Sequence, residues 1–345
     1  MTLGAASVSD RDVDAEPSLS ERPTPVARES SAARSLWQLA STLAALGAIW
    51  AAMYWSLGIS YGLVLALSIV AAGLIVRLFS IQHDCGHGSF FRWRLANAMA
   101  GRICSMATLT PFSNWRQHHL MHHLTWNNLD RRESGMDIYS ACLTVDEYRL
   151  LSRRQRRLHR LVQHPVIALL LLPPLIFVAL YRVPFDTPPS WHKERRSVWL
   201  TNGALIVVYA GLGYAVGFRE MLLVHAPIIG LAAVLGVWMF SLQHRFRGAT
   251  WMRGTAWSVR AASLNGSSFL KLPKIVQWFT GNLGFHHIHH LDSRIPNYRL
   301  EERHRGEDMI KATSILSIRD GLAAWRYALW DEAAGRMVRI SDVAV

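Results

Sequence analysis

The stretch "SLWQLASTLAALGAIWAAMYWSLGISYGLVLALSIVAAGLIV", residues Ser35–Val76, runs for 42 positions without a charged residue. As one helix it would be roughly 63 Å long at about 1.5 Å per residue. A bilayer core is about 30 Å thick and needs only about 20 helical residues. The stretch therefore predicts two membrane-spanning helices, with a turn between them at "LGISYG", residues Leu57–Gly62.

Two later runs predict two more spans. Residues Ser197–Phe218 carry no charge, and Met221–Gln243 contain His225 as their only titratable side chain. Because a span must satisfy its own backbone hydrogen bonds, we expect an all-α integral membrane protein with four transmembrane helices. The expected spans are roughly residues 36–56, 61–82, 197–218 and 221–243.

Basic loops set the predicted orientation. The segment "RLLSRRQRRLHR", Arg149–Arg160, contains six arginines, and "HKERRS", His192–Ser197, is also basic. Such loops are typical of the cytoplasmic side. The apolar run Pro165–Tyr181 would separate the two loops if it crossed, so we expect it to be interfacial or re-entrant. Residues Ala96–Pro111 are too short to span and predict another interfacial helix.

Composition changes at both ends of the chain. Residues 1–33 are rich in Ser, Pro and charged side chains without an apolar period, which predicts a disordered N-terminal tail. We expect the membrane domain and its cap at residues 34–320 and a cytoplasmic C-terminal tail at 321–345. The net charge of +13 lies largely in short segments beside the spans, which indicates lipid head groups rather than nucleic acid as partners.

Histidines gather in four places, all on the predicted cytoplasmic side. They occur in "HDCGH" at 83–87, "HHLMHH" at 118–123, "QHRF" at 243–246 and "HHIHH" at 286–290. Scattered histidines would not all fall at the inner ends of spans or in inner loops. Since imidazole binds zinc, iron and copper, this pattern predicts a metal centre.

Helical geometry predicts which histidines of each cluster face the metal. Two clusters contain H-x-x-H-H. At about 100° per residue, the three histidines that start at His119 or at His286 span an arc of about 100°. Starting at His118 or His287 widens the arc to about 140° or 160°. We therefore expect His119 and His286 to be ligands, and His118 and His287 to be supporting groups.

The number of imidazoles predicts two metal ions. A structural zinc takes four ligands, often including cysteine. Eight or nine imidazoles divided between two irons leave four or five for each, and oxygen-activating iron sites keep open positions. The pattern thus indicates two iron ions with dioxygen as co-substrate.

These motifs resemble the membrane fatty acid desaturases, a family of histidine-box di-iron enzymes. "HDCGH", "HLMHH" and "HHIHH" are similar to the three boxes of the family. "VWMFSLQHRF", "LNGSSFLKLPKIVQWFTGNLGFHHIHHL" and "SRIPNYRLEE" resemble its bacterial acyl-lipid branch, which includes Δ12 (omega-6) desaturases. The resemblance covers about residues 35–310.

The resemblance implies a four-helix stem in the cell inner membrane, with termini and boxes cytoplasmic and a histidine-rich di-iron cap. The metal ligands that it implies are His83, His87, His119, His122, His123, His244, His286, His289 and His290. Asp84 would hold a ligating imidazole by its other nitrogen, and Asn282 would support the ligands directly or through a water molecule. Pro296 predicts that the third-box helix ends nearby. Arg294 is then either a surface group at this helix end or the anchor of an acidic partner such as Asp137 or Glu133.

The activity implied is dioxygen-dependent insertion of a C=C bond into a fatty acyl chain carried by a phospholipid, CoA or acyl carrier protein. The chain has no GxGxxG motif after a strand, so an external ferredoxin or cytochrome b5-like donor with its reductase is implied. Arg245, Arg247 and the arginines of 149–160 suit either an acidic donor or lipid head groups. Arg247 and Arg260 depart from the acidic or neutral residues of the family, which leaves substrate and double-bond position open.

Two alternatives remain. The same boxes serve lipid or carotenoid hydroxylases, ketolases and acetylenases, whose products differ in mass from an alkene. A metal transporter or sensor is the alternative of another class. It is disfavoured because transporters carry polar groups inside their spans, and these spans are almost free of them.

Overall fold

The computed structural model describes residues 30–132, 142–306 and 313–344. Within these residues four helices are long and apolar enough to cross a membrane. They are α2 (Ala32–Ser56), α3 (Tyr61–His87), α9 (His192–Val216) and α10 (Phe218–His244). All four predicted spans are therefore present. α3 continues past the expected end at residue 82 to His87, and α9 begins before residue 197, at His192. Residues 1–29 of the predicted tail lie outside the described residues.

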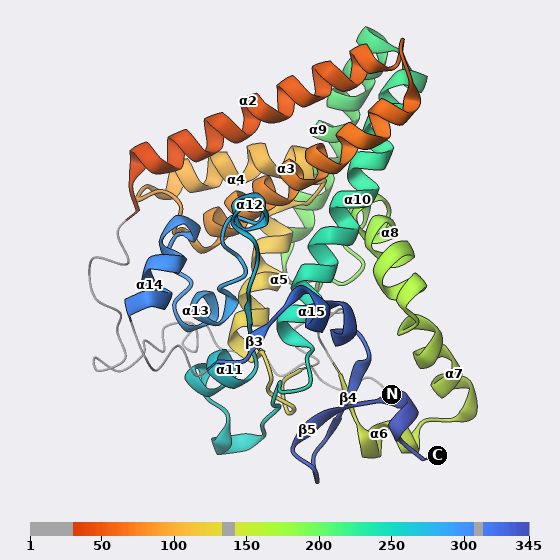
Figure 1. The fold of residues 1–345 in the computed structure, drawn as a ribbon, viewed down its shortest axis with the longest axis vertical. Coiled ribbons are helices and arrows are strands. Elements are labelled where there is room, and N and C mark those ends of the chain that lie inside the picture. Colours follow the sequence, from red (N-terminus) through yellow and green to blue (C-terminus); the bar gives the residue numbers. More distant parts are fainter. Residues whose placement is uncertain (1–29, 133–141, 307–312, 345) are drawn as a thin grey trace.

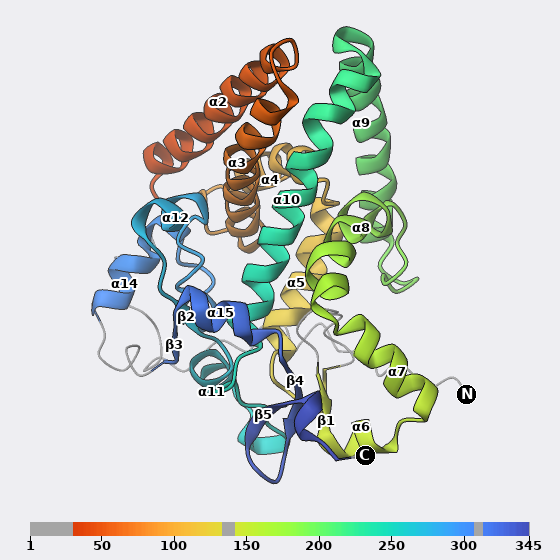
Figure 2. The same cartoon turned by 45° about the vertical axis from the view of Figure 1, so that its right-hand side comes forward.

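The spans form two hairpins. A turn at residues 57–60 joins α2 to α3, and Gly217, with φ at 94°, joins α9 to α10. Both turns lie at the same end of the molecule, and the non-spanning elements gather at the other end (Figures 1 and 2). The central helix is α3, which packs against α2 and α10 and is much more buried than α2 or α9. The ends of the spans opposite these turns thus reach one common region.

Shorter helices surround these ends of the spans. α4 packs on α3 and leaves Leu95, Met99 and Ile103 exposed, as expected of an interfacial helix. The run Pro165–Tyr181 is bent by 53° against the preceding helix, Arg153–Val162, which suits a broken span or a re-entrant loop. Its re-entrant or interfacial position stays a prediction. The helices before α9 are α4 (Arg94–Thr108), α5 (Phe112–Thr125), α6 (Val145–Leu150), α7 (Arg153–Val162), the π-helix η3 (Val166–Leu171), α8 (Leu172–Val178) and η4 (Leu180–Arg182).

Most of the cap follows α10 and contains short helices and two small sheets, one of which includes β1 from before α9. Its helices are η5 (Gly254–Ala256), α11 (Val259–Asn265), α12 (Lys274–Phe279), α13 (His286–Leu291), η6 (Asn297–Arg299), α14 (Leu300–Gly306), α15 (Ile318–Ala324) and η8 (Ile340–Asp342). The strands are β1 (Leu143–Thr144), β2 (Phe269–Leu270), β3 (Ile315–Leu316), β4 (Tyr327–Asp331) and β5 (Arg336–Arg339). β4 pairs with both β1 and β5, and β2 pairs with β3.

The C-terminal segment is not a free tail. Residues 327–339 form the hairpin of β4 and β5, and β1 pairs with β4 in parallel. Leu329 and Met337 are almost completely buried. The apolar strands "YALWD" and "RMVR" supply a face that packs on the cap, and Gly335, with φ at 60°, closes the turn. This hairpin therefore packs on the cap, and the boundary at residue 320 stays a prediction.

Candidate metal centre

Four helices bring nine histidines together at the ends of the spans opposite the two hairpin turns. The last turn of α3 carries the first box, and Gly88 ends this helix in the left-handed conformation. α5 and α13 carry the second and third boxes, and His244 is the last residue of α10. One group consists of His83, His87, His119, His123 and His289, and the other of His122, His244, His286 and His290. Within each group, one ligand nitrogen per residue lies within 4.8 Å of all the others.

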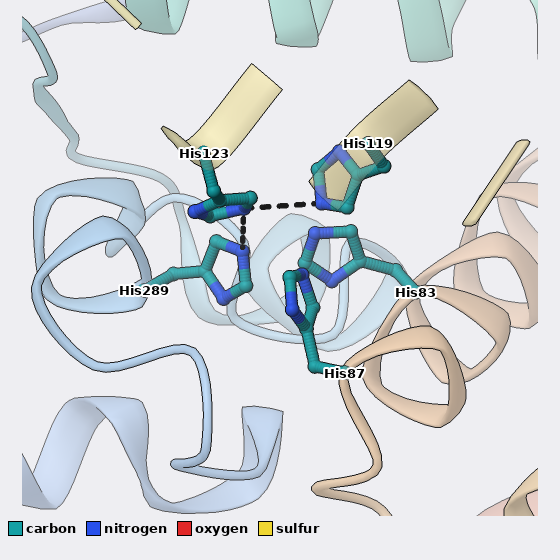
Figure 3. A group of neighbouring side chains, drawn as sticks. All are labelled: His83, His87, His119, His123 and His289. Carbon is teal, nitrogen blue, oxygen red and sulfur yellow. Dashed lines mark hydrogen bonds between the residues drawn. The ribbon is translucent and has the colours of Figure 1, made fainter. Parts of the chain in front are cut away.

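The five-histidine group is built on helical spacing. His83 and His87 are one turn apart on α3, and His119 and His123 are one turn apart on α5. Nε2 of His123 lies 3.2 Å from Nε2 of His119 and 3.0 Å from Nε2 of His289. Figure 3 shows the five rings facing a common space between the three helices. Nitrogens of separate elements therefore converge on one point.

The four-histidine group is completely buried. Nε2 of His286 lies 2.8 Å from Nε2 of His244 and 3.0 Å from Nε2 of His290. Nε2 of His122 lies 3.2 Å from Nε2 of His244 and 3.4 Å from Nε2 of His290. Each such pair of neutral rings has room for at most one hydrogen between its two nitrogens. Lone pairs are thus left over, which is the donor set that a cation requires.

Burial keeps these imidazoles in the form that binds metal. The pKa values of His119, His123 and His289 are held well below their usual range, chiefly by burial and then by neighbouring histidines. The same causes lower the pKa values of His286 and His290. A neutral imidazole is the ligand form. Among the described residues, Nε2 of His87 and Nδ1 of His244, His286 and His289 are buried without a hydrogen-bond partner, so an all-imidazole metal site fits the residues present.

His118 and His287 lie apart from both groups. Nε2 of His118 is 3.4 Å from Oγ1 of Thr187 and 3.6 Å from Oδ1 of Asp186. Nε2 of His287 is 3.3 Å from Nδ1 of His304. Burial, followed by His304, lowers the pKa of His287 to about 3. These are the two histidines that lie off the common helical arc.

Asp84 lies beside the imidazole of His83, and its role in holding that ring stays a prediction. Its Oδ1 is 3.6 Å from Nδ1 of His83, too far for a hydrogen bond. Its Oδ2 instead accepts hydrogen bonds from the backbone N–H and the side chain of Asn297. Asn282, with φ at 60°, donates to the carbonyl of Asn297, and Gln38 of α2 donates to the side chain of Asn297. This buried network ties the first box to the turn after the third.

Asn297 was missed in the sequence, although "IPNY" marks it as a turn residue. Arg294, in the same turn, donates from Nε to Oδ1 of Asp292 at 3.0 Å. Asp292 is buried and Arg294 is half-exposed. The predicted partners Asp137 and Glu133 lie outside the described residues. Among the described residues the ion pair of Arg294 is thus local, its link to Asp137 or Glu133 stays a prediction, and Asn297 joins this turn to the first box.

An apolar cavity of about 170 Å³ leads to the histidines. Four of its lining residues, His83, His119, His122 and His286, belong to the two groups. Most of the remaining wall is apolar and comes from α3, α4, α8 and α10, and His118 and Asp186 add polar groups. No local sequence pattern predicts this cavity, because its walls come from helices far apart in the chain.

Known proteins are similar in sequence to most of this chain. The model of the fatty acid desaturase family matches residues 60–312. A fatty acid desaturase of Bacillus subtilis is 39% identical over 298 residues, which cover 86% of this chain and 83% of the relative. An sn-1 oleoyl-lipid 12-desaturase of Anabaena variabilis is 25% identical over 262 residues, covering 72% and 69%.

A third relative is a temperature-sensitive sn-2 acyl-lipid omega-3 desaturase (ferredoxin) of Arabidopsis thaliana. It is 25% identical over 244 residues, which cover 65% of this chain and 52% of the relative. The family match sets aside the transporter alternative. Together with two histidine groups that suit metal ions and four helices that suit a membrane, it shows that the chain belongs to the fatty acid desaturase family and is an enzyme of fatty acyl metabolism.

Proposed function

We propose that the two histidine groups hold two iron ions and that the enzyme uses dioxygen to introduce a C=C bond into an acyl chain bound in the cavity. One observation carries this proposal. His83, His119, His122 and His286 both belong to the histidine groups and line the apolar cavity. An acyl chain in this cavity would lie directly beside the metal ligands.

The donor set favours iron. Five imidazoles in one group exceed the four ligands of a structural zinc, and neither group contains a cysteine or carboxylate. Iron accepts imidazole ligands and keeps positions open for dioxygen. When bound here, it would supply the oxidising power that removes hydrogen from an unactivated methylene, which no side chain can do.

The chain's own residues position the substrate and exclude water. Phe79, Val237 and Phe240 contribute apolar walls that hold methylene groups and offer no competing hydrogen bonds. Trp115 stacks on His119 with ring centroids 4.9 Å apart, so the cavity wall also fixes a ligand ring. A dry and rigid wall keeps the same carbons beside the metal groups.

We further propose that the substrate is carried by a membrane lipid and that a ferredoxin supplies electrons through its reductase. The names of the Anabaena and Arabidopsis relatives support an acyl lipid, and the latter also supports ferredoxin. CoA, acyl carrier protein and a cytochrome b5-like donor are the other candidates. The basic loops support a position in the inner membrane with the histidines and both termini cytoplasmic.

Expression in a host with simple fatty acids tests the reaction. Gas chromatography with mass spectrometry should show a new fatty acid that lacks two hydrogens and is absent with His290→Ala. The matched control is His287→Ala, which alters the same box outside the metal groups and should retain product. A product that gains an oxygen atom would show that the enzyme is a hydroxylase and would contradict desaturation.

A further inference from the structure

Helix α7 has two chemically distinct faces that are both exposed. Leu158, Leu161 and Val162 are 59%, 54% and 41% exposed. At about 100° per residue they lie within an arc of about 100°. Four arginines lie within a similar arc on the opposite face, namely Arg153, Arg156, Arg157 and Arg160, whereas Arg154, in the first turn, falls on the apolar side. The helix buries none of its residues.

Nevertheless, α7 is firmly attached to the fold along a narrow edge. The ring of His159 lies 5.6 Å from that of Tyr148, which is completely buried. Arg160 donates from Nε to the hydroxyl of Tyr148 at 2.8 Å. Directly after these residues, buried Arg245 donates to Oε1 of Gln163, the C-cap of the helix, so the C-terminal half of α7 is held at three positions. The exposure of both faces is thus a feature of a fixed helix.

The apolar face continues into a surface that suits lipid. Val166, Leu170, Leu171 and Leu175 of η3 and α8 are all about half-exposed. Figures 1 and 2 show α7 leading into the segment of η3 and α8, and α8 in turn packs beside α10. An exposed apolar stripe beside the spans and an arginine face on the same helix are the features of a helix that lies in a membrane interface.

We propose that α7 lies in the head-group layer of the inner leaflet and binds anionic phospholipids. Arg153, Arg154 and Arg157 have no acidic partner among residues 30–132, 142–306 and 313–344. Phosphates of anionic lipids would supply the missing charge. An acidic ferredoxin explains the arginines but leaves the leucine face in water. Arg245, one of the arginines that would suit an acidic electron donor, is also buried.

The position of α7 can be measured with the full chain in bilayer nanodiscs. Spin labels are placed on Leu161→Cys, on Arg157→Cys across the same helix, and on Ala333→Cys at the exposed β-turn. The three native cysteines are buried, and the unsubstituted chain gives their background. Label 161 should be relaxed by oxygen far more than by a water-soluble nickel chelate, with 157 intermediate and 333 aqueous. Equal access of nickel to labels 161 and 333 would overturn the proposal.

Lipid binding is tested with nanodiscs of phosphatidylcholine with and without phosphatidylglycerol. Native mass spectrometry should show phosphatidylglycerol retained by the wild type and lost from the triple variant R153Q/R154Q/R157Q. The expected loss is about fivefold per arginine near an anionic surface. Arg336→Gln, an exposed arginine of β5, is the matched control and should retain the lipid. Retained lipid with weakened ferredoxin binding would assign the arginines to the donor instead. Neither readout needs activity, so failure here leaves the proposed function standing.

Discussion

Asn297 donates two hydrogen bonds to Asp84, from its backbone N–H at 2.7 Å and from Nδ2 at 2.8 Å, and both reach the same oxygen. The two side chains are buried and 213 positions apart in the chain. Asp84 lies between two histidines of the first box, and Asn297 follows the third. This contact therefore fixes the separation of the first and third boxes, which meet in the five-histidine group.

The substitution Asn297→Asp tests this contact. It replaces a donor with a second carboxylate against Asp84, and the resulting buried charge should lower the free energy of unfolding by about 3–5 kcal/mol. Bound metal should fall with it. The exchange variant D84N/N297D restores one donor and one acceptor, so it should recover much of both losses. Metal analysis and thermal unfolding measure the result. Equal metal in all three chains would contradict a positioning role.

Histidines inside and outside the metal groups should respond differently to alanine. His123→Ala and His290→Ala each remove a ligand from one group, and we expect activity to be lost while the protein still inserts into the membrane. His118→Ala and His287→Ala should keep their metal, because neither ring belongs to a group. The iron-to-protein ratio of the purified variants separates the two classes. A loss of iron with His287→Ala but not with His286→Ala would reverse the assignment in the third box.

The sequence predicted features that depend on local periodicity. Uncharged runs gave the four spans, and the helical arc separated His119 and His286 from His118 and His287. It could not predict the partner of Asp84, because Asn297 comes close only when α13 and its following turn pack against α3. The β4–β5 hairpin was not predicted, although "YALWD" and "RMVR" are strand-like. Both strands are short, and β4 also pairs with β1, which lies far away in the chain. The cavity has no local signature, because α3, α5, α8 and α10 each supply only part of its wall.

The metal content offers a direct check of the two-group arrangement. Chains purified without chelator are expected to contain close to two iron ions, one for each group. Removal of the metal should lower the melting temperature, because a ligand that binds only the folded state stabilises it by mass action. Added ferrous ion should restore both stability and activity. One zinc and no iron per chain would exclude the di-iron proposal.

Gly236 on α10 offers the sharpest test of the cavity as the acyl site. Gly236 lines the cavity, and a Cβ atom built on it meets no other atom within 4 Å. Gly236→Leu should therefore project into the space where the chain would lie and narrow it. Gly230 lies on the same helix, also has open space around its Cβ position, and is not part of the cavity wall. Gly230→Leu is thus a matched control for helix and side chain.

Both substitutions replace glycine within a helix and should not weaken it, since leucine favours helix by up to about 1 kcal/mol over glycine. Both variants should therefore insert and keep their metal. Gly236→Leu should desaturate long acyl chains at a fraction of the wild-type rate and favour shorter chains. Gly230→Leu should keep the wild-type distribution. Feeding fatty acids of graded length and analysing the lipids by gas chromatography gives the comparison. If both variants show the wild-type distribution, the acyl chain does not pass Gly236.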